Sequence, residues 1–296
     1  MRALLALLFV GWSSIACAIT PAGGWWWNST QSGRGYTIEV QKGFLFFIGY
    51  LYNADGTATW YVAQGPYTDS SSRFTAPLLT FSGGPCITCP YTVPSQGPSP
   101  GNLTLDFATP TTGTLTWPGG SFPISRFYFN IPDDSRRLLG IWVYSALGVT
   151  DVEFTHWLTF DDTLTDPSLG LVATGLTSTG RVAIGTYAAS GTEIRVLVDA
   201  TTSFYDLWRF PKSFFDTNDA YGLWWTYSKS GSPVGPGSLG LTTVAVPSTT
   251  EATAVMGAEE KQARITALLE GMKAIDGLAP MDDKALAQRV QERKGE

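Results

Sequence analysis

Few side chains of this sequence could perform acid–base or nucleophilic chemistry. His156 is the only histidine among 296 residues, and it lies in a strand-like segment, 154–158. A histidine acts as a catalytic base when a nucleophile lies beside it. We expect no nucleophile elbow, and no phosphate-binding glycine loop lies between a predicted strand and a predicted helix. We therefore predict that His156 is a hydrogen-bonded strand residue, and we assign no catalytic residue.

Carboxylates are the remaining candidates for catalysis. A glycosidase needs two carboxyl groups about 5–10 Å apart across a groove, and the sequence alone cannot pair them. Acidic side chains beside strands usually face solvent or pair with arginine, so a hydrolase is the weakest of the functions we consider. Six acidic residues lie in or beside predicted strands: Glu39, Asp106, Glu153, Glu193, Asp199 and Asp206.

Metal ligands are equally scarce. Asp161, Asp162 and Asp166 crowd one segment, but their spacing matches no calcium-binding loop, so we predict a polar turn there. Cys86 and Cys89 are predicted to form a short disulfide, as is usual in an oxidising compartment. The alternatives are a redox dithiol, which lacks a following helix, and a zinc knuckle, which lacks a second pair of ligands. The sequence predicts no metal and no cofactor.

Aromatic side chains are abundant, with 11 Trp, 12 Tyr and 16 Phe. Trp25, Trp26 and Trp27 are consecutive, so at least one must face solvent, another layer or a ligand. Exposed Trp and Tyr rings can stack on sugar rings or contact protein partners. The competing interpretation is a two-layered body that buries both faces. We predict ligand contacts for six aromatic residues: Trp25, Trp27, Tyr36, Trp60, Tyr61 and Trp225.

Antiparallel strands must position these rings. Segments of strand character recur throughout 23–246, separated by glycine-containing turns such as Lys42-Gly43. This pattern predicts barrels or sandwiches rather than a parallel sheet. Both faces of the strand at 44–53 are apolar, so we expect this strand to be covered on both sides. The predicted fold is all-β, with two related antiparallel barrel- or sandwich-like units and a short C-terminal helical tail.

An internal repeat supports two related units. The pattern G-x-W-W-x4-S-G begins at Gly24 and again at Gly222, and a weaker match begins at Gly140. A five-position coincidence that includes two tryptophans is rare, so we treat the repeat as real. We expect a signal peptide at 1–18, one β unit at 19–135, a second at 136–246, and a linker with a helical tail at 247–296.

The Gly-x-Trp element resembles the signature of lipocalins, small barrels in which this Trp closes one end beneath an Arg of the last strand. The resemblance implies structural roles for Trp26 under Arg126 and for Trp142 under Arg209, each as a cation–π cap. We expect Trp224, which matches Trp26 in the repeat, to be structural as well. Segment 24–65 is more similar to a repeat of secreted proteobacterial β proteins, a resemblance that covers most of 23–245 and implies no activity.

The first residues predict export. Arg2, the apolar run 4–12 and the small residues up to Ala18 are typical of a signal peptide cleaved after Ala18, which predicts a periplasmic or secreted protein. The alternative is a lipoprotein anchored through Cys17. No later segment reaches 18 apolar residues, so we expect no transmembrane segment in the mature chain. A net charge of −6, from 19 basic and 25 acidic residues, argues against a nucleic-acid partner.

The last 46 residues differ in composition from the rest, because they contain no aromatic residue. We predict a helix that starts at 249–251 and ends near Gly277 and Pro280, then a second helix capped by Asp282 and running to about Lys294. We favour a solvated tail or a helical hairpin packed on the body over a partner-binding or oligomerising segment. Its apolar residues recur at helical spacing: Val255, Ala258, Ile265, Leu268, Leu269, Met272 and Ile275.

Many aromatic rings combined with few catalytic groups favour a non-enzymatic binding or envelope-associated protein, with carbohydrate or an apolar small molecule as ligand. One alternative is a structural or assembly protein that recruits a protein partner through 251–296. The other is a carboxylate-based hydrolase. Exposed tryptophans around a cleft would favour the first function, a free apolar helix face the second, and two close carboxylates in a groove the third.

Overall fold

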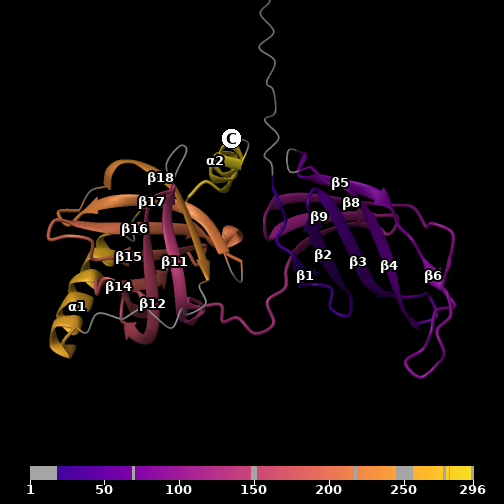
Figure 1. The fold of residues 1–296 in the computed structure, drawn as a ribbon, viewed down its shortest axis with the longest axis horizontal. Helices are drawn as coiled ribbons and strands as arrows, with labels where there is room; N and C mark the ends of the chain where they lie inside the picture. Colours follow the sequence, from indigo (N-terminus) through magenta and orange to yellow (C-terminus); the bar gives the residue numbers. More distant parts are fainter. Residues whose placement is uncertain are drawn as a thin grey trace, which may run out of the picture.

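The computed structural model describes residues 19–68, 71–147, 152–216, 219–231, 233–244, 256–275, 278–279 and 281–294. In these ranges the chain forms two antiparallel β units side by side, each with eight main strands, and a helical C-terminal part (Figure 1). The predicted all-β class is therefore confirmed. No helix in the described part is long and apolar enough to cross a bilayer. The predicted signal peptide, including Cys17, lies outside the described residues.

The first unit, barrel 1, is one curved sheet in the order β4-β3-β2-β1-β10-β9-β8-β5. Reciprocal backbone hydrogen bonds of 3.0 and 2.7 Å between Val62 and Leu79 link β4 to the chain just after β5, so the sheet curls almost into a closed barrel. Its strands are β1 (Gly24–Trp27), β2 (Gly35–Gln41), β3 (Phe44–Tyr52), β4 (Ala58–Pro66), β5 (Arg73–Pro77), β8 (Asn102–Thr109), β9 (Thr112–Trp117) and β10 (Gly120–Arg126).

The second unit, barrel 2, is a closed barrel in which each strand pairs with the next and β18 pairs back onto β11. A register shift between Phe160 and Asp162 lets β12 continue to Asp166, so the predicted polar turn at 161–166 is wrong. The strands are β11 (Gly140–Leu147), β12 (Val152–Asp166), β13 (Gly170–Thr177), β14 (Val182–Tyr187), β15 (Glu193–Val198), β16 (Phe204–Pro211), β17 (Asp219–Ser228) and β18 (Pro233–Val244).

The two barrels share one meander topology, in which β1 corresponds to β11 and β10 to β18. Trp26 and Trp142 confirm this match, because each indole Nε1 donates to the carbonyl four residues earlier, at 3.0 and 2.7 Å. Gly24 and Gly140 both open their strands at positive φ, +112° and +122°. The weaker sequence match, at Gly140, is therefore the structural equivalent of Gly24.

The stronger match, at Gly222, lies in β17, which is the seventh strand of its barrel rather than the first. Gly222 is needed for a different reason, because a Cβ there would lie 2.1 Å from the Arg209 carbonyl oxygen of β16. The prediction that the two Trp-Trp elements occupy equivalent places is wrong. A tryptophan doublet suits any strand with large side chains on both faces, whatever its place in the barrel.

The inside of barrel 1 is filled by apolar side chains, as the alternation of its strands requires. Trp26, Tyr36, Leu45 and Phe47 belong to this core and are at most 1% exposed. The outer face of β3 is not covered, and its rings point to solvent. The expected cover on both sides of 44–53 is therefore wrong, because the sheet curls upon itself instead of packing on a second layer.

Barrel 2 is covered on one side by α1 (Ala258–Ile275), which lies along its outer surface (Figure 1). Ile265, Leu268, Leu269, Met272 and Ile275 are buried against β14, β15 and neighbouring strands, as predicted. The helix begins later than predicted, because Met256 and Gly257 precede it without helical structure, while the rest of the predicted start lies outside the described residues.

The second helix, α2 (Asp283–Lys294), begins and ends as predicted. The Asp282 carboxylate accepts hydrogen bonds from the backbone N–H groups of Lys284 and Ala285, at 2.9 and 3.3 Å. Leu286 and Val290 pack against Phe214 and Leu239 of barrel 2. The apolar stripes of both helices are therefore used within the chain, and they are not free for a partner.

Candidate functional site

Exposed aromatic rings gather on the outer face of barrel 1. Trp25, Tyr50 and Trp60 are 45%, 40% and 51% exposed, although they belong to three different strands. Tyr50 and Trp60 are register partners on β3 and β4. Trp25 and Tyr50 have ring centroids 5.4 Å apart and planes inclined by 31°. The three rings therefore form a row across the sheet.

The strand between these rings carries small or short outward side chains. Gly35 on β2 is the register partner of Tyr50, and Thr37 is the partner of Trp25. The outward side chains of β2 beside the Trp25 and Tyr50 rings are therefore no larger than threonine. Three further exposed rings from β3 extend the row along the barrel, and we call the whole set the aromatic face: Trp25, Tyr50, Trp60, Phe44, Phe46 and Tyr52.

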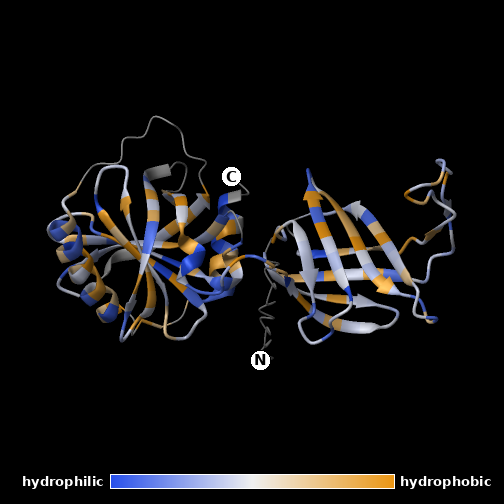
Figure 2. Cartoon of the chain, turned by 90° about the horizontal axis from the view of Figure 1, so that it is seen from below, coloured by the Kyte–Doolittle hydropathy of each residue, from blue (hydrophilic) through white to orange (hydrophobic). Residues whose placement is uncertain are grey.

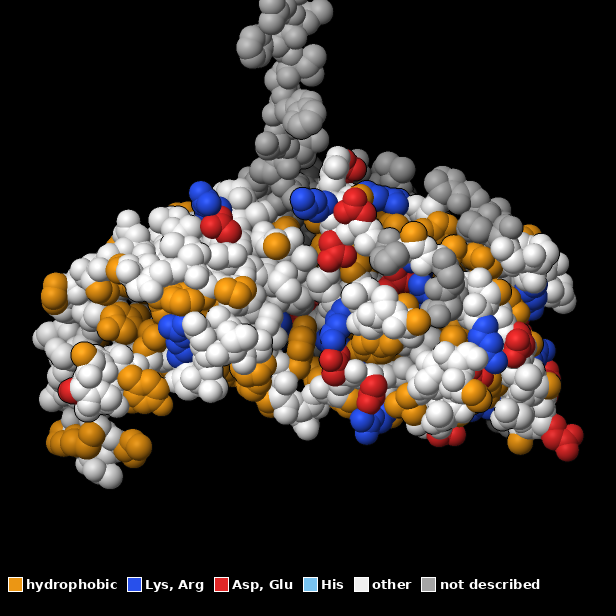
Figure 3. Space-filling view, turned by 180° about the vertical axis from the view of Figure 1, so that it is seen from behind, with side chains coloured by type: hydrophobic (Ala, Val, Ile, Leu, Met, Phe, Trp, Pro, Cys, Tyr) orange, Lys and Arg blue, Asp and Glu red, His pale blue; other side chains and the backbone are white. Residues whose placement is uncertain are grey.

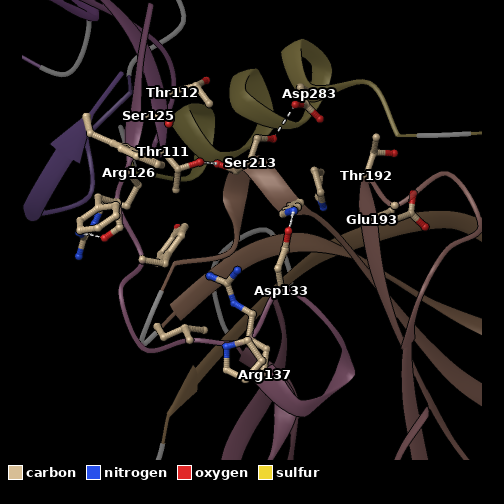
Figure 4. Close-up of a pocket in the computed structure, with 18 of the residues that line it drawn as sticks. Thr111, Thr112, Ser125, Arg126, Asp133, Arg137, Thr192, Glu193, Ser213 and Asp283 are labelled. Carbon is tan, nitrogen blue, oxygen red and sulfur yellow. Dashed lines mark hydrogen bonds and ion pairs between the residues drawn. The ribbon is translucent and has the colours of Figure 1, made fainter. Parts of the chain in front are cut away.

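A pocket of about 810 Å³ lies between the two barrels, beside the N-terminus of α2 (Figure 4). Trp27 forms part of its wall and packs on Phe127, with ring centroids 4.8 Å apart. Trp27 lies two residues after Trp25, so both rings project from the same side of β1. The pocket is therefore the continuation of the aromatic face along β1.

Hydroxyl groups and backbone contacts hold this pocket together. Thr111 Oγ1 of barrel 1 donates to the Ser213 carbonyl of barrel 2 at 2.6 Å, and Ser213 Oγ donates to the Asp283 carboxylate of α2 at 2.6 Å. Figure 4 shows both interactions along one rim, with Thr112 and Ser125 nearby. The pocket wall thus combines residues from both barrels and the second helix.

The charges around the pocket are largely neutralised. Lys212 Nζ donates to the Asp133 carboxylate at 2.6 Å, and Arg126 lies 3.4 Å from Asp216 across the two barrels. Arg137 is 7% exposed and donates to the Phe215 carbonyl at 2.7 Å. Because Lys212 and Arg126 have carboxylate partners and Arg137 donates to backbone carbonyls, the pocket suits an uncharged polar ligand better than an anion.

Tyr128 is the titratable group most affected by this environment. Its hydroxyl donates to the Phe215 carbonyl at 3.2 Å, and the Arg137 guanidinium lies 4.6 Å from its ring centroid. Burial, assisted by the Asp216 carboxylate, raises the pKa of Tyr128 to about 12 despite the opposing effect of Arg137. Tyr128 therefore stays neutral throughout the physiological range.

The six aromatic residues predicted to contact ligand do not form one site. Trp25 and Trp60 lie on the aromatic face, and Trp27 lines the pocket. Tyr36 and Tyr61 point into barrel 1. Trp225 packs on the outer side of barrel 2 beneath Arg209. The prediction missed Tyr50, although the large apolar residues at every second position of 44–52, four of them aromatic, were a signal for it.

The two arginines predicted to cap tryptophans have other partners. The Arg126 guanidinium lies 5.7 Å from the Tyr128 ring, and the Arg209 guanidinium lies 5.5 Å from the Trp225 ring. Among the described residues, neither forms the predicted contact with Trp26 or Trp142. Arg126 pairs with Trp26 only as a backbone neighbour on β10. Arg209 lies on β16, so it cannot play the part of a last-strand arginine.

Trp224 and His156 point into barrel 2. Trp224 packs against the core beside Trp208, with ring centroids 6.3 Å apart. His156 Nε2 lies 2.9 Å from the Asp206 carboxylate, and both side chains are about nine-tenths buried. The prediction that His156 is a satisfied strand histidine is therefore confirmed.

The other acidic candidates with described ion pairs are matched by basic residues. Asp106 pairs with Arg73, Asp199 with Lys229, and Glu193 with two buried arginines. Among the described residues, no cluster of three or more His, Cys, Asp or Glu could hold a metal ion. The predicted Cys86–Cys89 disulfide is confirmed. These ion pairs give Asp106, Asp199 and Glu193 partners within the fold.

One segment contradicts the expectation that no nucleophile elbow motif occurs in the sequence. Residues 97–101 read Gly-Pro-Ser-Pro-Gly, which matches the letters of a nucleophile elbow. The segment precedes strand β8 rather than a helix, and the Ser99 hydroxyl donates to the Gly101 carbonyl at 3.1 Å. The only histidine lies in the other barrel. The pentapeptide is therefore a proline-rich turn and no catalytic element.

Neither a protein-family model nor a curated protein matches this chain.

Proposed function

We propose that this protein is a non-enzymatic binding protein that holds carbohydrate on the aromatic face of barrel 1. The observation that carries the proposal is the row of Trp25, Tyr50 and Trp60, three rings about half exposed on strands β1, β3 and β4. A folded protein rarely leaves such rings in water without a use for them. Flat, exposed rings suit the apolar faces of sugars, because they offer contact area at little cost in conformational entropy.

The rigid scaffold supports this proposal. Each ring projects from a hydrogen-bonded strand whose inward neighbours, such as Tyr36 and Phe47, are fully buried. The rings are therefore held in place before ligand arrives, which lowers the entropic cost of binding. The Trp27 pocket would receive a part of the same ligand, because it offers a further ring and the hydroxyl groups of Thr112 and Ser125.

Export belongs to the same proposal. The leader expected at 1–18 and the expected resemblance to secreted proteobacterial β proteins both support a location outside the cytoplasm. The Cys86–Cys89 disulfide supports an oxidising compartment. The alternative of a partner-recruiting tail is less well supported, because the apolar residues of α1 are already packed on barrel 2.

The test is binding to a panel of soluble oligosaccharides, followed by tryptophan fluorescence, together with pull-down on insoluble polysaccharides. Trp25→Ala and Trp60→Ala should each weaken binding about three- to tenfold, the value of one aromatic contact. Tyr91→Ala is the matched control, because Tyr91 is 75% exposed but lies outside the aromatic face and the pocket. Equal binding by all three variants, or no binding to any glycan, would refute the proposal.

A further inference from the structure

The loop between β6 (Phe81–Ser82) and β7 (Ser95–Gln96) exposes its apolar side chains. We call residues 83–94 the disulfide loop, because Cys86 and Cys89 are bonded within it. Ile87, Tyr91 and Val93 are 105%, 75% and 73% exposed. Figures 1 and 3 show the loop projecting from barrel 1, with hydrophobic side chains gathered at its tip.

The loop and its surroundings carry no charge. Residues 74–105 include no Asp, Glu, Lys, Arg or His, and the residues directly before and after this stretch, Arg73 and Asp106, form an ion pair with each other. Single exposed apolar residues are ordinary on protein surfaces, but three in one uncharged segment are not. The charge-free stretch is therefore suited to transfer from water into an apolar environment.

The loop also has a fixed shape. The disulfide holds Cys86 and Cys89 at a Cα separation of 5.0 Å, and the Thr92 hydroxyl donates to the Gly83 carbonyl at 3.0 Å. Three prolines in 83–94 restrict the backbone and also remove three N–H donors. Each missing donor lowers the cost of moving the loop into an apolar medium, where an unpaired N–H is unfavourable.

The chemistry of the tip distinguishes among its possible partners. A convex tip needs either a concave apolar receptor or a fluid apolar medium. The pocket between the barrels is rimmed by Lys212, Asp133 and other charged groups, so it is a poor receptor for this apolar tip of a second copy. Tyr91 lies between Ile87 and Val93 in the sequence. Tyrosine is favoured where an apolar region meets water, as at a membrane surface.

We infer that the disulfide loop is a membrane-contact element, which places Ile87, Val93 and the Tyr91 ring in the interface of an uncharged bilayer. The net charge of −6 gives the protein no attraction to anionic lipid, so the contact is apolar. This role is separate from glycan binding, because the aromatic face does not include the loop. It would hold the protein at a surface while the aromatic face stays in water.

The experiment is flotation of the purified protein with phosphatidylcholine vesicles. The protein should float with the vesicles, as well at high salt as at low salt, and anionic lipid should not improve binding. Ile87→Ser combined with Val93→Ser should reduce the bound fraction by at least about tenfold, because two aliphatic side chains are lost from the interface. Ile87→Leu should bind normally, and Cys86→Ser with Cys89→Ser should weaken binding through loss of loop order.

Remote controls separate this inference from the proposed function. Phe129→Ser removes an equally exposed ring elsewhere, and Trp25→Ala removes a ring of the aromatic face. Both variants should float normally. The inference would be overturned if the bound fraction were unchanged by the Ile87 and Val93 substitutions, or if binding were lost at high salt. The inference would also be overturned if the protein did not bind vesicles but formed dimers that Ile87→Ser disrupts. That result would show that the loop contacts a second copy.

Discussion

Glu193 is the shared partner of two buried arginines, Arg195 and Arg209. Its carboxylate accepts hydrogen bonds from Arg195 at 2.7 Å and from Arg209 at 2.6 and 2.7 Å, and all three side chains are at most 8% exposed. The two arginines also donate to the carbonyls of Ile275 and Ala279, which follow the barrel in sequence. This group of three therefore attaches the C-terminal segment to barrel 2.

Glu193→Gln should destabilise the protein by about 3–5 kcal/mol, because two buried guanidinium groups would lose their counter-charge. The measurement is the free energy of unfolding in urea. Glu259→Gln is the matched control, since Glu259 lies on the exposed side of α1. A loss below about 1 kcal/mol for Glu193→Gln would mean that water or backbone groups already neutralise the arginines.

Tyr128 predicts how stability responds to alkaline pH. Its pKa is raised to about 12 in the fold, against about 10 in the unfolded chain, so the folded state favours the neutral phenol. The resulting stabilisation is complete below pH 10 and is lost as the pH rises from about 10 to about 12. It amounts to about 2–3 kcal/mol.

Tyr128→Phe should therefore flatten the alkaline loss of stability between pH 10 and pH 12. At pH 8 the variant should be about 1 kcal/mol less stable, because the hydrogen bond to the Phe215 carbonyl is lost. Unfolding free energies of both proteins at pH 8, 10 and 11.5 provide the test. Parallel curves over this range would show that Tyr128 ionises as easily in the fold as in the unfolded chain.

The side of the sheet that Trp60 and Tyr61 each face could not be predicted from the sequence. Trp60 and Tyr61 are adjacent, and alternation requires them to face opposite sides of β4. The sequence does not tell which of them faces water, because both faces of β3 and β4 are rich in apolar residues. Trp60 turned out to be exposed and Tyr61 to face the core. The curl of the sheet, which depends on contacts far apart in the chain, decides between them.

At the scale of elements, local signals were reliable wherever one turn or cap determines the structure. Lys42 and Gly43 both have positive φ, 47° and 75°, as a tight hairpin between β2 and β3 requires. Asp282 caps α2 as its position suggested. The Trp-Trp repeat did not predict equivalent positions in the two barrels. Gly24 is required for its positive φ, whereas Gly222 is required because a Cβ would clash with the neighbouring strand.

The contact between α1 and barrel 2 depends on one glycine. A Cβ at Gly271 would lie 2.8 Å from Cε2 of Tyr205, whose ring packs in the same apolar cluster and whose hydroxyl donates to the Ala267 carbonyl at 3.3 Å. Gly271 therefore lets the helix approach the barrel closely, although glycine is about 1 kcal/mol worse than alanine within a helix.

Gly271→Ala should destabilise the protein by about 1–2 kcal/mol, because the clash with the Tyr205 ring outweighs the gain in helix propensity. The same substitution in a Tyr205→Leu background should be neutral or stabilising, since the ring is gone. Urea unfolding of the four proteins completes the cycle, and hydrogen exchange of α1 amides shows whether the helix detaches. Equal effects in both backgrounds would exclude the contact as the cause.

At the scale of the whole molecule, the two barrels have separate interiors. The core cluster around Trp26 contains only residues of barrel 1, and the clusters around Trp142, Met272 and Leu286 contain only later residues. The contacts described above that join the barrels are polar, such as Thr111 to Ser213 and Arg126 to Asp216. Figure 2 shows two bodies joined by one connection.

Separate cores predict two unfolding transitions, because cooperativity comes from shared apolar packing and little of it crosses the pocket between the barrels. Calorimetry of the full chain should resolve them. Leu105 is fully buried in barrel 1, so Leu105→Ala should cost about 2–5 kcal/mol and lower one transition only. Glu193→Gln should lower the other. If each substitution shifts both transitions equally, the barrels unfold as one cooperative body, and the polar contacts around the pocket are stronger than their number suggests.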